Sequence, residues 1–229
     1  MSSPSPSIGS HAMFKDRVEA GQLLADRLTR YAGPETIVLA LPRGGVPVGY
    51  EIAKRLNCPL DVLIVRKIGA PMQPELALGA IVDGRAPEVV LNDELVRELG
   101  ISRFYLEREE EELLKEIDRR HKLYRRGNAA YEVKDRTVIV VDDGIATGAT
   151  VRAALKALRR GNPKRLILAV PVAPPDTVAS LSAEVDDLVC LDSPTYFRAI
   201  SPFYTRFNQV SDDEVIKLLA AAPKASATT

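Results

Sequence analysis

Short runs of consecutive apolar residues recur along the chain, separated by segments with helical periodicity. Each run has the length of a strand, and the runs are TIVLAL (36–41), DVLIV (61–65), TVIVVD (137–142), RLILAVPV (165–172) and DLVCL (187–191). Near-continuous apolar strands that alternate with helices are typical of a parallel sheet covered on both faces. The pattern therefore predicts an α/β fold with a doubly wound, mainly parallel sheet.

Helical patterns flank the first of these runs. An amphipathic opening helix is predicted over residues 14–31, before the stop at Gly33-Pro34. Its apolar stripe consists of Phe14, Val18, Leu24, Leu28 and Tyr31. A glycine-rich turn follows the first strand, and a second helix is predicted from about Val46 to Leu56. This order of strand, turn and helix is the unit of an α/β fold.

The alternation is interrupted between residues 67 and 127. Residues 67–91 carry Gly69, Pro71 and Pro74 and then the short runs GAIVDG and EVVL, which predict a long irregular loop followed by a hairpin. Residues 92–127 include the stretch FYLEREEEELLKEIDRRHKLYRR (104–126), which predicts a long solvated helix with one apolar edge. That edge packs either on the core or on a second subunit, which leaves a homodimer open. Its residues are Leu106, Leu113, Leu114, Ile117 and Tyr124.

The length of 229 residues suits one large domain, and the ends of the chain differ from its middle. The opening MSSPSPSIGSHAM is rich in Ser and Pro and predicts a disordered leader or a cloning remnant over residues 1–13. The domain is expected over 14–222, with a helical insertion at about 92–127 and a hood-like segment at about 192–222. A flexible tail is expected over 223–229.

Charge and composition exclude several classes of function. The 31 basic residues balance the 31 acidic ones, so no overall field attracts nucleic acid or an anionic membrane surface. No apolar stretch approaches the roughly 20 residues needed to span a bilayer. Cys58 and Cys190 lack metal-binding spacing and predict core residues in a reducing compartment. With no secretory signal visible, a cytoplasmic protein without a membrane or nucleic-acid partner is expected.

The stretch VIVVDDGIATGAT (138–150) combines a buried strand, two acids and a turn of small residues. At the carboxyl end of a parallel strand, such a turn offers backbone N–H groups and a helix N-terminus to a phosphate. Two carboxylates repel a phosphate, but they suit sugar hydroxyls or a metal-bound ligand. A sugar phosphate fits both halves, although acid pairs also end strands in phosphoacceptor and magnesium-binding domains.

Order and spacing favour the sugar phosphate, because the motif resembles the phosphoribosyl pyrophosphate (PRPP) signature of type I phosphoribosyltransferases. The stretch LPRGGVPVG (41–49) resembles the pyrophosphate loop of that family. VRKIGAPMQPELALGAI (65–81) occupies the place of its flexible active-site loop, so a mobile lid is predicted over 68–78. The segment 92–127 resembles the insertion of a subgroup of bacterial phosphoribosyltransferases.

The resemblance implies roles for individual residues. Asp142 and Asp143 would hold the ribose hydroxyls, directly or through Mg²⁺. Arg43, Gly44 and Gly45 would contact pyrophosphate, and a cis Pro42–Arg43 bond would turn backbone donors of this loop toward it. Arg66 and Lys67 would neutralise the leaving group. The backbone of residues 146–149 and the hydroxyls of Thr147 and Thr150 would bind the 5′-phosphate. The residues of this turn implied to bind PRPP are Gly144, Ile145, Ala146, Thr147, Gly148, Ala149 and Thr150.

The implied reaction is the Mg²⁺-dependent transfer of ribose 5-phosphate from PRPP to a nitrogenous base, with release of pyrophosphate. The alternative is a non-catalytic protein that senses PRPP, but Arg43 and Lys67 favour an enzyme, because a sensor need not stabilise departing pyrophosphate. Ala146 stands where hypoxanthine-guanine enzymes carry a base-binding acid. The base would then be chosen by residues 192–204, where Tyr196, Phe197 or Tyr204 either stacks on the ring or only packs.

Overall fold

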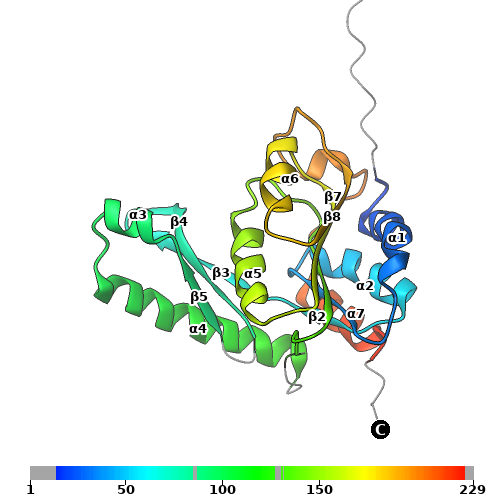
Figure 1. Cartoon of the computed structure of the whole chain (residues 1–229), viewed down its shortest axis with the longest axis horizontal. Coiled ribbons are helices and arrows are strands. Elements are labelled where there is room, and N and C mark those ends of the chain that lie inside the picture. The colour runs from blue at the N-terminus through cyan, green and yellow to red at the C-terminus, as the bar shows by residue number, and fades with distance from the viewer. Residues whose placement is uncertain (1–13, 85–86, 127–129, 131, 225–229) are drawn as a thin grey trace, which may run out of the picture.

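A five-stranded parallel sheet forms the centre of the molecule (Figure 1). The computed structural model describes residues 14–84, 87–126, 130 and 132–224. The strands are β1 (Thr36–Ala40), β2 (Leu60–Val62), β6 (Thr137–Val141), β7 (Arg165–Val172) and β8 (Asp187–Asp192), in the order β2-β1-β6-β7-β8. Every neighbouring pair is parallel. The predicted doubly wound α/β fold is confirmed.

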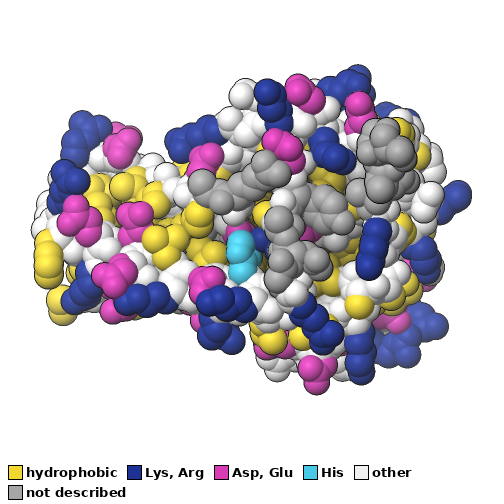
Figure 2. Space-filling view, turned by 90° about the horizontal axis from the view of Figure 1, so that it is seen from below, with side chains coloured by type: hydrophobic (Ala, Val, Ile, Leu, Met, Phe, Trp, Pro, Cys, Tyr) yellow, Lys and Arg dark blue, Asp and Glu magenta, His cyan; other side chains and the backbone are white. Residues whose placement is uncertain are grey.

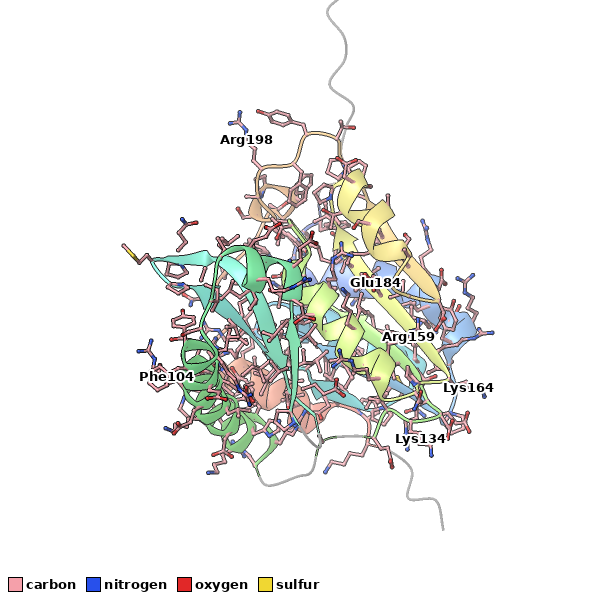
Figure 3. The ribbon with its side chains drawn as sticks, turned by 60° about the vertical axis from the view of Figure 1, so that its left-hand side comes forward. Phe104, Lys134, Arg159, Lys164, Glu184 and Arg198 are labelled. Carbon is pink, nitrogen blue, oxygen red and sulfur yellow. The ribbon has the colours of Figure 1, made fainter. Side chains whose placement is uncertain are left out.

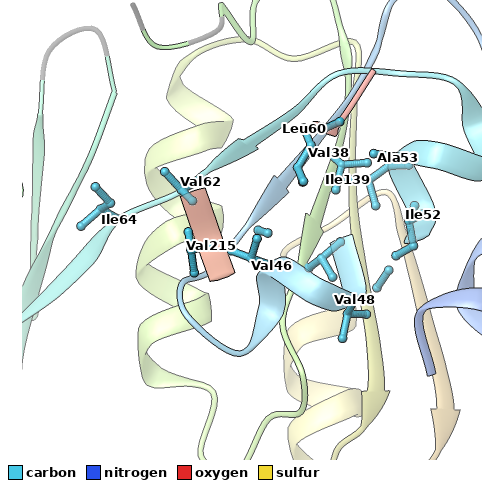
Figure 4. Close-up of a cluster of buried hydrophobic side chains, with 14 of the residues drawn as sticks. Val38, Val46, Val48, Ile52, Ala53, Leu60, Val62, Ile64, Ile139 and Val215 are labelled. Carbon is cyan, nitrogen blue, oxygen red and sulfur yellow. The ribbon is translucent and has the colours of Figure 1, made fainter. Parts of the chain in front are cut away.

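Successive side chains of the central strands enter two separate apolar clusters, as the pleat of a strand requires. On one face Val38 and Ile139 pack with apolar residues of three helices, part of which Figure 4 shows. These helices are α1 (Arg17–Leu28), α2 (Gly45–Leu56) and α7 (Asp212–Ala221). On the other face Ile37 and Val138 pack with residues of α5 (Ala149–Arg160) and α6 (Pro175–Ser182). Burial of both faces explains why the strands read as continuous apolar runs.

The direction of winding reverses between β1 and β6. After β1 the chain moves to one side of it to form β2, and β6 lies on the other side. The loops that leave β1 and β6 therefore diverge, and a crevice forms beyond the carboxyl ends of the two strands. The two motifs LPRGG and DDGIATG follow these two strands.

An arm extends from this core (Figure 1). It contains the antiparallel strands β3 (Val65–Ala70), β4 (Gln73–Val82) and β5 (Glu88–Leu91), followed by α3 (Asp93–Glu98) and α4 (Arg103–Arg125). The three strands lie between α4 on one face and α5 on the other. Seen from below, the arm exposes apolar side chains between charged ones (Figure 2).

The predicted irregular loop over residues 67–78 is wrong, because most of these residues belong to β3 and β4. Pro71 lies in the connecting turn, where no ladder hydrogen bond is needed. Pro74 falls where the register shifts, since Gly69 pairs with Ala77 and Ala70 with Gln73. Turns and bulges are the places where a sheet tolerates proline, so composition alone gave a misleading picture.

Several smaller expectations also need correction. The run DVLIV ends one strand at Val62 and begins another at Val65. Val18 of the predicted helical stripe is exposed, and Phe14 lies before α1, in a bridge with Tyr204. Cys190 is only partly buried, whereas Cys58 is a core residue as predicted.

The apolar edge of α4 packs on the core, which was one of the two alternatives. Ile117 and Tyr124 are buried, and Leu106, Leu113 and Leu114 are partly buried against the same cluster. The outer side of the helix is exposed at Phe104, which points away from the arm (Figure 3). None of the described helices is long and apolar enough to cross a membrane. The predicted leader and the end of the predicted tail lie outside the described residues.

Candidate active site

Asp142 and Asp143 follow β6 at the reversal point of the sheet. The Asp143 amide donates to an Asp142 carboxylate oxygen at 2.8 Å, and the Asp143 side chain is buried. Burial raises the pKa of both carboxyls, and the charge of Asp143 raises the pKa of Asp142 further. The pair is therefore poised to gain from a cation or from hydroxyl donors.

Asp143 is held from two other parts of the chain. The Arg17 guanidinium, at the start of α1, donates to Asp143 Oδ2 from Nε at 2.7 Å and lies equally close through a second nitrogen. The Tyr204 hydroxyl donates to the main-chain carbonyl of Asp143 at 2.6 Å. Arg17 opposes the burial effect on the pKa of Asp143. The acid is thus fixed in position and partly neutralised.

The loop after β1 approaches the acid pair so closely that it has no room for side chains. A Cβ on Gly44 would lie 2.0 Å from Asp143 Oδ2, and a Cβ on Gly45 would lie 2.7 Å from the Val141 carbonyl oxygen. The Pro42–Arg43 peptide bond is cis, as predicted. Glycines at these two positions allow the loop and the acid pair to share one small volume.

The turn after the acid pair is anchored at one residue and open at others. The Ile145 amide donates to the Val172 carbonyl at 2.9 Å, and its side chain is buried. Ala146, Thr147 and Ala149 are exposed. Gly148 precedes α5 with φ 73°, and no side chain caps the helix. The first N–H groups of a 12-residue helix are therefore available to an anion.

Two cavities flank the acid pair and its turn. One, of about 360 Å³, is lined by Arg17, Arg43, Gly44 and Asp143, among others. The other, of about 410 Å³, lies between α5 and the arm and is lined by Lys67, Thr147 and Arg152, among others. Arg43 and Lys67, which were both expected to contact pyrophosphate, thus line two different cavities.

Comparison with known proteins agrees with this geometry. Residues 13–205 match the model of the phosphoribosyl transferase domain. The chain belongs to this family. It is 46% identical over 210 residues to a Mycobacterium tuberculosis protein named "Putative phosphoribosyl transferase". That match covers 92% of this chain but only 47% of the relative.

The fold of the phosphoribosyltransferase chain has a solved counterpart in the protein TT1426 from Thermus thermophilus. The two are 41% identical with a TM-score of 0.81, and the match covers 93% of this chain and all of TT1426. Because this match includes nearly the whole chain, the arm is part of the shared architecture.

Not every residue implied by the family resemblance lies near the acid pair. Arg66 and Lys67 are consecutive in β3 and therefore point to opposite faces. Lys67 faces α5 and the turn after β6, whereas Ile68, which lies on the same face as Arg66, packs in the cluster that includes α4 residues. Arg66 thus lies on the face of the arm away from the turn.

The three aromatic candidates for base binding occupy different surroundings. Tyr204 is buried against Phe14 and Phe207, and its hydroxyl is bonded to Asp143. Phe197 stacks on Phe203 with ring centroids 5.3 Å apart. Tyr196 is 67% exposed beside Arg198, which stands at the tip of this segment (Figure 3). Tyr196 alone among the three presents most of its ring to solvent.

Sequence reasoning missed Arg17 and Phe207. Arg17 lies 126 positions before Asp143, in the first turn of a helix that was read only for its apolar stripe. Its guanidinium carbon lies 3.9 Å from the centre of the Phe207 ring. Nothing local in the sequence marks either residue, since Arg17 matters through its tertiary contact with Asp143 and Phe207 through its contact with Arg17.

A magnesium ion would have only a few protein ligands here. Among the described residues, no group of three or more His, Cys, Asp or Glu side chains could hold a metal ion. The two adjacent carboxyls with raised pKa values still fit Mg²⁺, which keeps several waters and binds through one or two carboxylates together with phosphate oxygens. Asp142 is the more available of the two, because Arg17 already occupies Asp143.

Proposed function

We propose that this protein is a phosphoribosyltransferase that moves ribose 5-phosphate from PRPP to a nitrogenous base and releases pyrophosphate. The observation that carries the proposal is the contact between Asp143 and Gly44, which places the acid pair of β6 against the loop of β1. The crevice has three features, namely the acid pair, the small-residue turn after it and the glycine loop after β1. A single ligand with a sugar, a phosphate and a pyrophosphate would contact all three. Such a reaction would serve nucleotide salvage in the cytoplasm.

Each part of PRPP has a chemically suitable partner. The exposed turn and the uncapped N-terminus of α5 suit the 5′-phosphate. The carboxylates of Asp142 and Asp143 suit the ribose 2′- and 3′-hydroxyls as acceptors. The backbone of Gly44 and Gly45, with Arg43 beside it, suits pyrophosphate, because glycine lets N–H groups approach oxyanions closely.

Catalysis would come mainly from positioning and charge. The leaving pyrophosphate and the sugar C1 would be held between two rigid loops of the same sheet, which lowers the entropic cost of the transfer. Bound Mg²⁺ would supply charge neutralisation at the pyrophosphate oxygens. Asp142 would hold that ion through water, while Arg43 would stabilise the departing group electrostatically.

The acceptor would enter near residues 192–204, where Tyr196 offers an exposed aromatic face. We therefore propose a planar base as the acceptor class, because a stacked ring gains from such a face.

The carboxyl pair also predicts a pH dependence of PRPP affinity. Since burial raises the pKa of both carboxyls, lowering the pH protonates them and should weaken binding, and Asp142→Asn should reduce that dependence.

The test is release of pyrophosphate from PRPP and Mg²⁺ in the presence of a panel of purine and pyrimidine bases and simple amines. Release that requires one acceptor, and that is lost in Asp142→Asn/Asp143→Asn, supports the enzyme. A matched control is Asp26→Asn, which alters an exposed ion pair with Arg55 on another surface. Tight PRPP binding without release for any acceptor would favour the alternative, a PRPP-sensing protein.

A further inference from the structure

The structure assigns a role to Arg17 that the sequence did not predict: we propose that Arg17 binds the pyrophosphate group, forming a two-arginine clamp with Arg43. This inference rests on the proposed function and names a further residue of the same site. Both arginines line the cavity of about 360 Å³ that also contains Gly44 and Asp143. They come from different elements, α1 and the loop after β1, and so approach the cavity from different directions.

The Arg17 guanidinium is oriented for in-plane binding. One face of the group is covered by the Phe207 ring at 3.9 Å. Nε and one terminal nitrogen are directed to Asp143, and the other terminal nitrogen donates to the Asn208 carbonyl at 2.8 Å. Because a guanidinium has five N–H donors, these contacts leave about two donors for another acceptor. The side chain is only 11% exposed, so those donors are held in place.

Electrostatics explain why a cation is needed at this position. The Asp143 carboxylate lies against Gly44, in the loop that would bind pyrophosphate. Two anions would then be neighbours, and their repulsion would weaken binding. A guanidinium that contacts both removes this conflict, because it offers one edge to the carboxylate and further donors to phosphate oxygens.

A purely positioning role for Arg17 predicts a different result. If Arg17 only holds Asp143 in place, then its loss should weaken ribose binding and leave pyrophosphate binding unchanged. If Arg17 also contacts pyrophosphate, its loss should weaken pyrophosphate binding by much more than ribose binding. The two roles can therefore be separated with two probes, inorganic pyrophosphate with Mg²⁺ and ribose 5-phosphate, each measured by titration calorimetry.

The variants are Arg17→Gln, which removes the charge, and Arg17→Lys, which keeps it but loses the planar fork. Arg206→Gln is the matched control, because Arg206 forms an ion pair with the neighbouring Asp16 and does not line this cavity. We expect Arg17→Gln to raise the Kd for pyrophosphate by at least about tenfold, with a smaller loss for Arg17→Lys. The Kd for ribose 5-phosphate should change less than about threefold in both variants, and Arg206→Gln should bind both probes normally.

An unchanged pyrophosphate affinity in the folded Arg17 variants would overturn the proposal. So would equal losses for the two probes, or a loss for ribose 5-phosphate alone. Thermal unfolding checks the fold of each variant, and Arg17→Lys decides the matter if Arg17→Gln does not fold. Wild-type protein that binds neither probe would contradict the proposed function itself, which is a different outcome from a normal wild type with unaffected variants.

Discussion

The carboxylate of Asp143 lies directly against the Cα of Gly44. The two residues follow different strands, and their contact joins the loop of β1 to the acid pair of β6. A Cβ on Gly44 would come within 2.0 Å of Asp143 Oδ2, a distance that real side chains do not reach. Because Arg17 and Tyr204 hold Asp143 from other sides, the acid has little freedom to move away.

We therefore predict that Gly44→Ala displaces the Asp143 carboxylate. PRPP affinity should fall by at least about tenfold, the equivalent of about 1.4 kcal/mol, because ribose and pyrophosphate contacts are both disturbed. Calorimetric titration with PRPP and Mg²⁺ measures the effect. Gly33→Ala is the control, since a Cβ there meets nothing within 4 Å. Equal affinities for Gly44→Ala and Gly33→Ala would show that the contact is unimportant for binding.

The second prediction concerns Lys67, which lines the cavity that contains Thr147. Its position favours the 5′-phosphate over pyrophosphate, in contrast to the expectation from the sequence. Lys67→Met should raise the Kd for ribose 5-phosphate several-fold, because one exposed positive charge near a phosphate is lost. The Kd for pyrophosphate should stay within about twofold.

Lys122→Met provides the control for this experiment, since Lys122 is exposed on α4 and pairs with Asp118. A Lys67→Met variant that loses pyrophosphate affinity alone would return Lys67 to the leaving-group site that the family resemblance implied. Pyrophosphate and ribose 5-phosphate, the two probes used for Arg17, thus also test which phosphate group Lys67 binds.

The central sheet and the acid-pair motif at its carboxyl edge could be predicted because their signals are local. Continuous apolar runs reflect strands buried on both faces, and the acids and small residues after Val141 occur in one short stretch. The apolar runs and the motif depend on neighbours in sequence, so one sequence is sufficient to detect them. The cis bond before Arg43 was implied instead by the resemblance of LPRGG to a family loop, and the structure has this bond.

The arm and the Arg17 contact depend on tertiary structure instead. Proline and glycine between residues 69 and 74 suggested an irregular loop, but packing between α4 and α5 stabilises strands with a bulge. The predicted lid is thus a β-hairpin, and closure over a ligand would have to move it as a unit. Tyr105 on α4 reinforces this arrangement by donating its hydroxyl to the Gly69 carbonyl at 2.9 Å.

A third prediction concerns the buried ion pairs between the arm and the core. Arg125 at the end of α4 bonds Asp61 of β2 through Nε at 2.9 Å and lies 3.0 Å from Asp83, the residue that follows β4. His121 also contacts Asp83. All three members of the Asp61–Arg125–Asp83 group are buried. Arg125→Met would leave two buried carboxylates without this cation and should lower the free energy of unfolding by about 3 kcal/mol at pH 7.

The sign of the pH dependence follows from Asp83, whose pKa is raised above its ordinary value because burial outweighs Arg125 and His121. Removing Arg125 raises that pKa further. Between the unfolded and folded pKa values the native state binds more protons, so stability falls as pH rises through this window. The loss in Arg125→Met should therefore be smaller at pH 5 than at pH 7, as urea unfolding would measure.

The control for this pair of measurements is Arg103→Met, which removes an exposed ion pair with Glu107 on the same helix. Such surface pairs contribute about 0–1 kcal/mol, and the effect should not grow with pH. If Arg125→Met were no less stable than Arg103→Met, the buried group would not be what joins the arm to the core.

The last prediction separates Tyr204 from Tyr196, two aromatic residues of one segment with different surroundings. The Tyr204 hydroxyl is buried on the Asp143 carbonyl, and burial raises its pKa, so it acts as a neutral donor. Tyr204→Phe should lower the free energy of unfolding by about 1–2 kcal/mol and weaken PRPP binding, because the carbonyl beside the acid pair loses its partner.

Tyr196 is 67% exposed, so Tyr196→Ala should change stability by less than about 0.5 kcal/mol. If Tyr196 stacks on the acceptor, its loss should raise KM for the base several-fold and leave PRPP affinity unchanged. Thermal unfolding measures the stability of each variant, and steady-state kinetics measures KM for both substrates. An acceptor KM that rises for Tyr204→Phe but not for Tyr196→Ala would assign base binding to the buried ring instead.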